Sequence, residues 1–452
     1  MKIHIIAIGG SIMHNLAIDL KNNGHLVSGS DDDIHEPSLS RLKQHHLLPE
    51  KLGWFPEKIT KDLDLVILGM HARQDNPELL KAQELGLKIY SYPEFIYQNS
   101  ISKKRIVIGG SHGKTTITSM ILHVLKKNNI SIDYLVGSQI QGFDTMVKIT
   151  NTNPILVAEG DEYLASPIDQ RPKFLIYQPH IAVISGIAWD HINVFPTYDD
   201  YKNAFVKFIQ SIESKGTLIF NELDTEIKSI ISQADRKDIE YIPYSYPNYS
   251  IQNNQVFIHF ENHHYPVKVF GKHNLQNLQA ALLVCKKLNI NEHTFLNSIS
   301  DFTGAAKRLE KWIDENHLLV FRDFAHAPSK VKATIDAVKE LYPNKDLIAA
   351  FELHTYSSLN EKFLIEYKDT LEKAKHKIVY FDAHTLEIKK MPPLHPDTII
   401  KGFNDPSIKV ADNKKDLLKI LSEIGIKDKV LLLMSSGTFS NLTKEEIISL
   451  NT

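Results

Sequence analysis

Short apolar runs rich in β-branched residues alternate along the whole chain with segments whose apolar residues have helical spacing. Runs such as Ile3–Ile8, Arg105–Ile108, Ile155–Ala158 and Leu347–Phe351 are followed by glycine or a polar residue, a pattern typical of buried strands. Strands that alternate with amphipathic helices favour parallel sheets covered by helices. The pattern therefore predicts an α/β protein.

The same pattern divides the 452 residues into three units, which agrees with about 150 residues per domain. The polar sequence Ser102–Arg105 is a candidate linker between the first and second units. Between residues 240 and 270 the pattern becomes strand-rich and antiparallel, and a third unit begins near Arg308. The predicted domains are residues 1–101, 102–306 and 307–452.

Composition narrows the class of protein. Hydrophobic residues make up 42% and charged residues 23%, as in an ordinary globular protein, and the net charge is only −2. No overall basic excess points to nucleic acid, and no apolar run of about 18 residues predicts a membrane span. The single cysteine, Cys285, excludes an intrachain disulfide and a multi-cysteine metal site. We expect a cytoplasmic protein.

The clearest chemical motif is Ile106–Thr116, in which a strand, a glycine-rich turn, Gly-Lys-Thr and an apolar helix follow one another. Backbone N–H groups at such a turn and at the following helix N-terminus form a phosphate site. Lys114 would reach the β- and γ-phosphates of ATP, and the Thr115 hydroxyl would bind Mg²⁺. Ile108 stands where the usual first glycine of this motif is found. The predicted phosphate-binding residues are Gly110, Ser111, His112, Gly113, Lys114, Thr115 and Thr116.

Two further polar groups follow predicted strands of the second unit. Glu159 comes directly after Ile155–Ala158, and Asp190-His191 follows the strand at Ile181–Ser185. Because parallel strands end at a common edge, Glu159 and His191 are candidate Mg²⁺ ligands around a transferring phosphoryl group. Alone, Glu159 could instead belong to a solvated helix N-terminus, and His191 could be a packed or capping histidine.

With these motifs in place, the chain resembles the Mur ligases, ATP-dependent amide-bond-forming enzymes of peptidoglycan synthesis. The resemblance covers nearly the whole chain and rests on motifs in a fixed order. These are Gly110–Thr116, Ala158–Tyr163, Trp189–His191, Gly271–Asn277, Lys307–Glu310 and Asp323–Pro328. It implies an N-terminal Rossmann-like UDP-binding domain, a central P-loop ATPase-like domain and a C-terminal Rossmann-like domain.

The resemblance also implies roles for single residues. Lys114 would be catalytic, Thr115 and Glu159 would bind one Mg²⁺, and His191 would bind a second. His273, Asn274 and Asn277 would contact the nucleotide. Arg308 would touch the γ-phosphate, Asp323 would bind the ribose, and His326 would lie near the reacting groups. The muramoyl carboxylate would become an acyl phosphate, which the amine of a second substrate then attacks.

The first unit carries a second candidate phosphate site. Gly9-Gly10-Ser11 closes the first strand, and Gly29-Ser30-Asp31 closes the second. Ser11 and His14 occupy the second and third glycine positions of a dinucleotide fingerprint, which disfavours NAD. The resemblance implies that this unit holds the UDP of UDP-N-acetylmuramate, with the pyrophosphate at a helix N-terminus. The candidate contacts are Gly9, Gly10, Ser11, Ser30, Asp31 and His71.

The amine donor distinguishes two subgroups that resemble the chain. One adds L-alanine to UDP-N-acetylmuramate, and the other adds the recycled tripeptide L-alanyl-γ-D-glutamyl-meso-diaminopimelate. Asp169–Phe174 and Met434–Phe439 resemble the peptide-ligase subgroup, which makes the tripeptide the leading expectation and L-alanine the alternative. Arg171, Lys173, Ser435 and Ser436 are the candidate donor contacts. A folylpolyglutamate synthase-like ligase and a non-catalytic nucleotide-binding protein are further alternatives.

Overall fold

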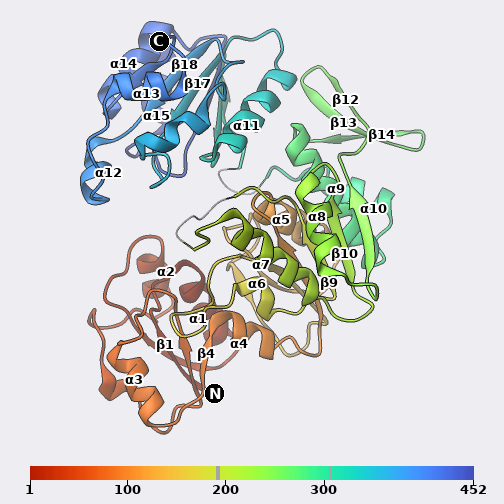
Figure 1. Cartoon of the computed structure of the whole chain (residues 1–452), viewed down its shortest axis with the longest axis vertical. Coiled ribbons are helices and arrows are strands. Elements are labelled where there is room, and N and C mark those ends of the chain that lie inside the picture. Colours follow the sequence, from red (N-terminus) through yellow and green to blue (C-terminus); the bar gives the residue numbers. More distant parts are fainter. Residues whose placement is uncertain (190–193, 305–307, 452) are drawn as a thin grey trace. The chain divides into compact units, whose positions relative to one another are not determined.

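The structure is a computed structural model that describes residues 1–189, 194–304 and 308–451. The chain divides into two compact units. Unit 1 comprises Met1–Tyr246 and Gln276–Ile299, and unit 2 comprises Pro247–Leu275 and Ser300–Thr452. Each unit contains parallel strands that alternate with helices (Figure 1), which confirms the predicted α/β class. The predicted domain boundaries stay predictions, and residues 306 and 307 lie outside the described part of the chain.

The N-terminal part of unit 1 is a parallel sheet in the order β2-β1-β3-β4. Its strands are β1 (Lys2–Ile6), β2 (Leu26–Ser30), β3 (Leu65–Leu68) and β4 (Ile89–Ser91). The helices are α1 (Ser11–Asn22), α2 (Ser38–Gln44), α3 (Pro77–Glu84) and α4 (Tyr92–Gln98), with a 3₁₀ turn, η1 (Pro56–Lys58). Because β1 lies between β2 and β3, α1 begins close to the carboxyl ends of the two inner strands.

The central part of unit 1 is a seven-stranded sheet in the order β11-β10-β9-β5-β8-β6-β7. Its strands are β5 (Lys104–Gly109), β6 (Asp133–Leu135), β7 (Val147–Lys148), β8 (Ile155–Glu159), β9 (Ile181–Ile184), β10 (Thr217–Asn221) and β11 (Glu240–Tyr244). The helices are α5 (Lys114–Lys127), α6 (Lys173–Ile176), α7 (Tyr198–Gln210), α8 (Thr225–Ala234) and α10 (Glu292–Ile299). Strand β5 pairs with β8 and β9, so the segments that follow these three strands meet at one edge.

Unit 2 contains two sheets. A small antiparallel sheet consists of β12 (Tyr249–Gln252), β13 (Gln255–Phe260) and β14 (His263–Val267). The larger sheet has the order β15-β16-β20-β17-β18-β19, and only β15 runs antiparallel to its neighbour. Its strands are β15 (Glu310–Glu315), β16 (Leu318–Asp323), β17 (Leu347–Glu352), β18 (His376–Tyr380), β19 (Lys409–Ala411) and β20 (Val430–Met434).

The helices that accompany the larger sheet of unit 2 come from the connections between its strands and from the segment after β20. They are α11 (Pro328–Leu341), α12 (Ala383–Ile388), α13 (Pro396–Phe403), α14 (Lys414–Ile424) and α15 (Lys444–Ile448), with 3₁₀ turns η2 (Glu361–Tyr367) and η3 (Ser449–Asn451). Helix α9 (Lys272–Lys287) begins in the unit 2 range and ends in the unit 1 range.

One sequence interpretation is wrong. The residues after 240 were expected to form antiparallel strands, but β11 pairs parallel with β10 as the edge of the central sheet. The antiparallel expectation holds only for β12, β13 and β14. The hydrophobic pattern located these strands but did not show which strands they pair with or in which direction. Strand direction depends on the connections between strands and not on the local pattern.

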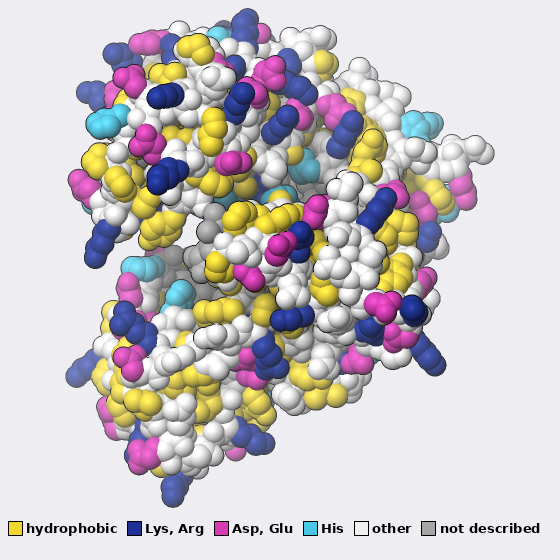
Figure 2. Space-filling model, viewed as in Figure 1, with side chains coloured by type: hydrophobic (Ala, Val, Ile, Leu, Met, Phe, Trp, Pro, Cys, Tyr) yellow, Lys and Arg dark blue, Asp and Glu magenta, His cyan; other side chains and the backbone are white. Residues whose placement is uncertain are grey.

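The distribution of charged side chains on the surface agrees with the small net charge of the chain. On the face drawn in Figure 2, cationic and anionic side chains are interspersed over both units. Among the described residues, no helix is long and apolar enough to cross a membrane.

A buried ion pair fixes the N-terminal end of the central sheet. The ammonium of Lys103 contacts the carboxylate of Asp133, and their side chains are 3% and 0% exposed. Asp133 also accepts hydrogen bonds from the Thr150 backbone N–H at 3.0 Å and the Asn153 amide at 2.9 Å. Removing the cation would therefore leave a buried carboxylate without its counter-charge.

We expect Lys103→Met to lower the free energy of unfolding by about 3–5 kcal/mol, the usual cost of breaking a buried pair. Chemical denaturation measures this change. Lys104→Met is the matched control, because Lys104 is exposed on the adjacent position. Equal stabilities of the two variants would contradict the structural role assigned to the pair.

Candidate active site

The predicted phosphate loop has the conformation that its sequence requires. It connects β5 to α5, and Gly110 and Gly113 have φ values of 126° and 80°. These left-handed values strain any residue that has a Cβ. A Cβ at Gly110 would also collide with the Ser185 hydroxyl, and one at Gly113 would collide with the side-chain amide of Asn277. Both glycines are thus required by conformation and by close packing.

Lys114 begins α5 and lies against carboxylates. Its ammonium donates to the Gly110 carbonyl oxygen and to Glu162 Oε2, both at 2.8 Å. Burial opposes the charge of Lys114, but Glu162, Asp161 and Glu159 outweigh that effect and raise its pKa. The lysine is therefore held as a cation at the carboxyl edge of the central sheet, where a γ-phosphate would be bound.

Thr115 and Glu159, the two predicted metal ligands within the described residues, are in contact. The Thr115 hydroxyl donates to Glu159 Oε1 at 2.7 Å, and the Gly137 backbone N–H donates to Oε2 at 2.6 Å. Burial, followed by the charge of Asp161, raises the pKa of Glu159. A hydroxyl and a carboxylate are oxygen donors that suit Mg²⁺, which usually completes its shell with phosphates and water.

No group of three His, Cys, Asp or Glu side chains that could hold a metal alone occurs in the described ranges. His191, the predicted ligand of a second Mg²⁺, lies outside the described residues, and its role stays a prediction.

The phosphate loop is braced by neighbours that the sequence did not identify. Ser111 donates its backbone N–H to the Gly186 carbonyl at 2.9 Å, and its hydroxyl contacts Tyr201 OH at 2.9 Å. Tyr201 in turn donates to Glu162 Oε1 at 3.3 Å. The His112 carbonyl accepts a bond from the Ser185 hydroxyl, and Thr116 is buried in the first turn of α5. Tyr201 belongs to no sequence motif, so its position beside the phosphate loop is apparent only from the tertiary structure.

The three nucleotide-contacting residues predicted on α9 divide between the units. Asn277 packs against Gly113 of the phosphate loop in unit 1. In unit 2, the Asn274 amide donates to the Phe270 carbonyl at 3.1 Å. Burial lowers the pKa of His273, and the negative charge of Asp323 opposes this effect. The structure thus brings Asn277 to the phosphate loop and His273 close to Asp323.

Three predicted residues gather at the carboxyl end of β16 in unit 2. Asp323 accepts from the backbone N–H groups of Leu309 and Phe324 at 2.9 Å each. The Arg308 guanidinium lies 4.6 Å from the centre of the Phe324 ring. His326 Nδ1 lies 2.9 Å from the Phe324 carbonyl oxygen. Each is positioned at a strand end, while their joint contact with an ATP bound to unit 1 stays a prediction.

The predicted UDP contacts mostly gather at the carboxyl ends of β1 and β2. The Gly9 backbone N–H donates to Asp31 Oδ2 at 2.7 Å, and burial raises the pKa of Asp31. Gly10 precedes the first residue of α1, Ser11, whose side chain is exposed. Ser30 is buried and accepts from the Ala7 backbone N–H through its carbonyl. His71 is exposed after β3, the neighbouring strand.

The predicted donor contacts are not together in one unit. In unit 1, Arg171 binds Asp169 through two nitrogens, at 2.9 and 2.6 Å, and Glu94 at 3.1 Å. Lys173 lies 3.4 Å from Asp161. In unit 2, Ser435 donates to Glu352, and the Ser436 hydroxyl is buried without a hydrogen-bond partner. The two cations are already paired with carboxylates, which weakens the argument that they receive a donor carboxylate.

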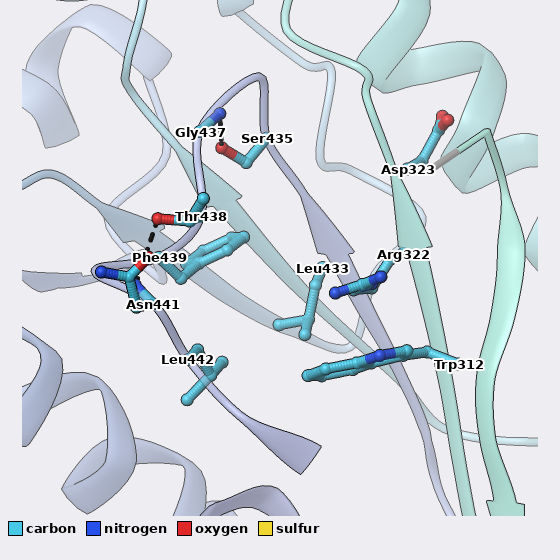
Figure 3. Close-up of a pocket in the computed structure, with 10 residues that line it drawn as sticks. All are labelled: Trp312, Arg322, Asp323, Leu433, Ser435, Gly437, Thr438, Phe439, Asn441 and Leu442. Carbon is cyan, nitrogen blue, oxygen red and sulfur yellow. Dashed lines mark hydrogen bonds between the residues drawn. The ribbon is translucent and has the colours of Figure 1, made fainter. Parts of the chain in front are cut away.

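A cavity of about 270 Å³ adjoins Ser435 in unit 2. Figure 3 shows Trp312, Arg322 and Leu433 from the sheet facing Phe439 and Leu442 from the segment after β20. The Arg322 guanidinium stacks 4.2 Å above the Trp312 ring and bonds Glu310. The Asp323 side chain points away from the other lining residues in this view. The cavity combines an aromatic wall with polar groups from the segment that was predicted to hold the donor.

Comparisons with known proteins agree with this arrangement. The Mur ligase family, catalytic domain, matches residues 2–103, and the Mur ligase middle domain matches residues 108–285. The UDP-N-acetylmuramate–L-alanine ligase of Caldicellulosiruptor bescii is 33% identical, over 86% of this chain and 85% of that protein. The protein of the same name from Carboxydothermus hydrogenoformans is 31% identical, over 79% of this chain and 77% of its own length.

Solved structures show the same fold. The UDP-N-acetylmuramate-alanine ligase of Thermotoga maritima aligns with a TM-score of 0.73 and 20% identity, covering 99% of both chains. A murein peptide ligase from Psychrobacter arcticus aligns with a TM-score of 0.65 and 22% identity, covering 100% of this chain and 99% of that one. With the phosphate loop, the strand-end carboxylates and the sequence matches in agreement, the chain belongs to the Mur ligases, ATP-dependent enzymes that form amide bonds.

Proposed function

We propose that this ligase joins an amine donor to the lactyl carboxylate of UDP-N-acetylmuramate. The observation that carries the proposal is the site around Lys114, where a phosphate loop, a cation and a Thr115–Glu159 oxygen pair meet. The relatives that match most of the chain carry names that specify UDP-N-acetylmuramate. The UDP would bind where α1 begins, close to Asp31, and the reaction would take place in the cytoplasm.

In the first step, a carboxylate oxygen of the acceptor attacks the γ-phosphorus of ATP. The bond from that phosphorus to the β–γ bridging oxygen breaks, ADP leaves, and an acyl phosphate forms. Lys114 stabilises negative charge on the transferring phosphoryl group. Mg²⁺, held by Thr115 and Glu159, would supply further charge neutralisation. In the second step, the donor nitrogen attacks the acyl carbon, and inorganic phosphate leaves.

L-Alanine is the donor that the comparisons support, because the relatives at 31–33% identity are named for it. This favours the alternative from the sequence over the leading expectation. The tripeptide is a second candidate. The cavity beside Ser435, at about 270 Å³, approaches the roughly 300 Å³ of pockets for drug-sized ligands and exceeds what alanine needs. Arg322 lines that cavity, and because its guanidinium is paired with Glu310, a peptide carboxylate would have to share or displace that partner.

We expect Lys114→Met to lower kcat by at least about 100-fold, because a preorganised charge at a transferring phosphoryl group contributes several kcal/mol. The variant also leaves the fully buried Glu162 without its cation. We therefore expect it to unfold more easily, and Lys114→Met/Glu162→Gln to recover that stability without recovering activity. ADP release and thermal melting measure the two effects. Near-normal turnover in the stable double variant would refute the assignment of Lys114.

The donor is tested by measuring kcat/KM for L-alanine and for L-alanyl-γ-D-glutamyl-meso-diaminopimelate at fixed ATP and UDP-N-acetylmuramate. We expect L-alanine to be preferred by at least tenfold, which corresponds to about 1.4 kcal/mol of transition-state discrimination. Arg322→Leu is then expected to leave the value for L-alanine unchanged. A tenfold preference for the tripeptide, lost in Arg322→Leu, would instead establish the second candidate.

A further inference from the structure

A buried carboxylate ends β17 in unit 2. Glu352 is 3% exposed, and burial raises its pKa. Its Oε2 atom accepts from the Phe439 backbone N–H at 2.8 Å and from the Ser435 hydroxyl. Both donors belong to the segment that follows β20. The carboxylate is therefore oriented by two hydrogen bonds from that one segment.

The segment that surrounds Glu352 is strained. Phe439, Ser440 and Asn441 have consecutive φ values of 50°, 52° and 58°. Left-handed backbone at a residue with a side chain costs on the order of 1–3 kcal/mol and persists only where the surroundings enforce it. Such conformations concentrate at functional sites, which makes the segment a candidate part of one.

His354 lies against this carboxylate. Its Nδ1 atom is buried, has no hydrogen-bond partner, and lies 3.8 Å from Glu352 Oε1. A Cβ at Gly437 would lie 2.7 Å from the same nitrogen, so the segment after β20 closes that side of the ring. The His354 side chain as a whole is 34% exposed. Because Nδ1 is buried, this exposed area belongs to the other atoms of the side chain.

Burial and one neighbouring cation favour the neutral form of the imidazole. Burial lowers the pKa of His354, Lys389 at the end of α12 lowers it further, and Asp382 after β18 opposes both. Glu352 Oε1 lies 3.8 Å behind Nδ1, so a proton carried on Nδ1 would face a carboxylate oxygen. A neutral imidazole that carries its proton on Nδ1 has a free lone pair on Nε2 and can accept a proton there.

The second step of the proposed reaction needs such a group. An α-amino group has a pKa of about 8, so the donor arrives mainly as an ammonium, which cannot attack carbon.

Glu352 lies at the same edge of the larger sheet as Asp323, the residue predicted to bind the ribose. It is one residue beyond the position of β17 that is in register with Asp323, and β20 lies between the two strands. At about 4.8 Å per strand, the two positions are about 10 Å apart on one sheet edge.

We propose that His354 Nε2 takes the proton from the donor ammonium, with Glu352 as the positioning residue behind it. The proposal rests on the proposed ligase function. The freed nitrogen lone pair forms the C–N bond, the bond from the acyl carbon to the phosphoryl oxygen breaks, and inorganic phosphate leaves. The nitrogen then loses its second proton to solvent, and the imidazolium returns its proton to water. The loose 3.8 Å approach of Glu352 is expected to tighten when substrates bind.

The test compares two nucleophiles in His354→Gln. Hydroxylamine is mostly unprotonated at neutral pH and traps an acyl phosphate without a base. With the amine donor that the wild type prefers, we expect kcat to fall about 100-fold or more, the usual contribution of a general base. Hydroxamate formation should fall less than threefold, which also shows that the variant is folded and makes acyl phosphate. His384→Gln, an exposed histidine on α12, is the matched control and should leave both rates unchanged.

Glu352→Gln supplies a second readout. A carboxylate beside an imidazole favours its charged form, so removing it lowers the pKa of His354. We expect the acidic limb of the pH profile with the amine donor to move to lower pH, with a lower maximum rate. A merely structural role for Glu352 would not move that limb.

Three results are decisive. Amide formation by His354→Gln within threefold of wild type would overturn the proposal. An equal loss of amide and hydroxamate formation would also overturn it, because His354 would then act in folding or binding. If the wild type forms neither ADP nor hydroxamate from ATP and UDP-N-acetylmuramate, the proposed function itself fails, which is a separate outcome.

Discussion

The arrangement of the ATP site depends on one electrostatic constraint, the meeting of Lys114 with three carboxylates at the carboxyl edge of the central sheet. Glu159, Asp161 and Glu162 all raise the pKa of Lys114, and Glu162 bonds it directly. Buried charges of this kind need close partners, because desolvation is costly. The lysine and the carboxylates therefore hold each other in place.

Unit 2 also has carboxylates at the carboxyl edge of its larger sheet. Asp323, Glu352 and Asp382 follow three parallel strands, and each accepts hydrogen bonds from a neighbouring loop. Glu352 and Asp382 both accept hydrogen bonds from the strained segment after β20, which contains three consecutive left-handed residues. The carboxylates at the strand ends thus fix the conformation of the neighbouring loops. One of these carboxylates, the buried Glu352, lies beside His354.

The residues predicted to bind the amine donor form a less consistent site than the residues predicted to bind ATP. Arg171 and Lys173 resemble a peptide-ligase motif, yet their charges are paired with Asp169, Glu94 and Asp161. A motif describes residue types, whereas recognition of a carboxylate needs donors that are not already occupied. The cavity beside Ser435 is lined by polar and aromatic groups, but its Arg322 is likewise paired with a carboxylate, that of Glu310. Arg322 was not part of any motif that the sequence supplied.

The sequence by itself determined the α/β class, the phosphate loop and the strand-end carboxylates. Local rules govern these features: short apolar runs rich in β-branched residues mark buried strands, and glycines allow the left-handed turns of Gly110 and Gly113. Tertiary structure alone decided which groups meet. It placed Tyr201 on Ser111 and Asn277 on Gly113, pairs separated by 90 and 164 positions. Such contacts depend on strand order and chain crossing, which also made β11 a parallel edge strand. A local pattern carries no information about them, because neighbours in a parallel sheet come from distant parts of the chain.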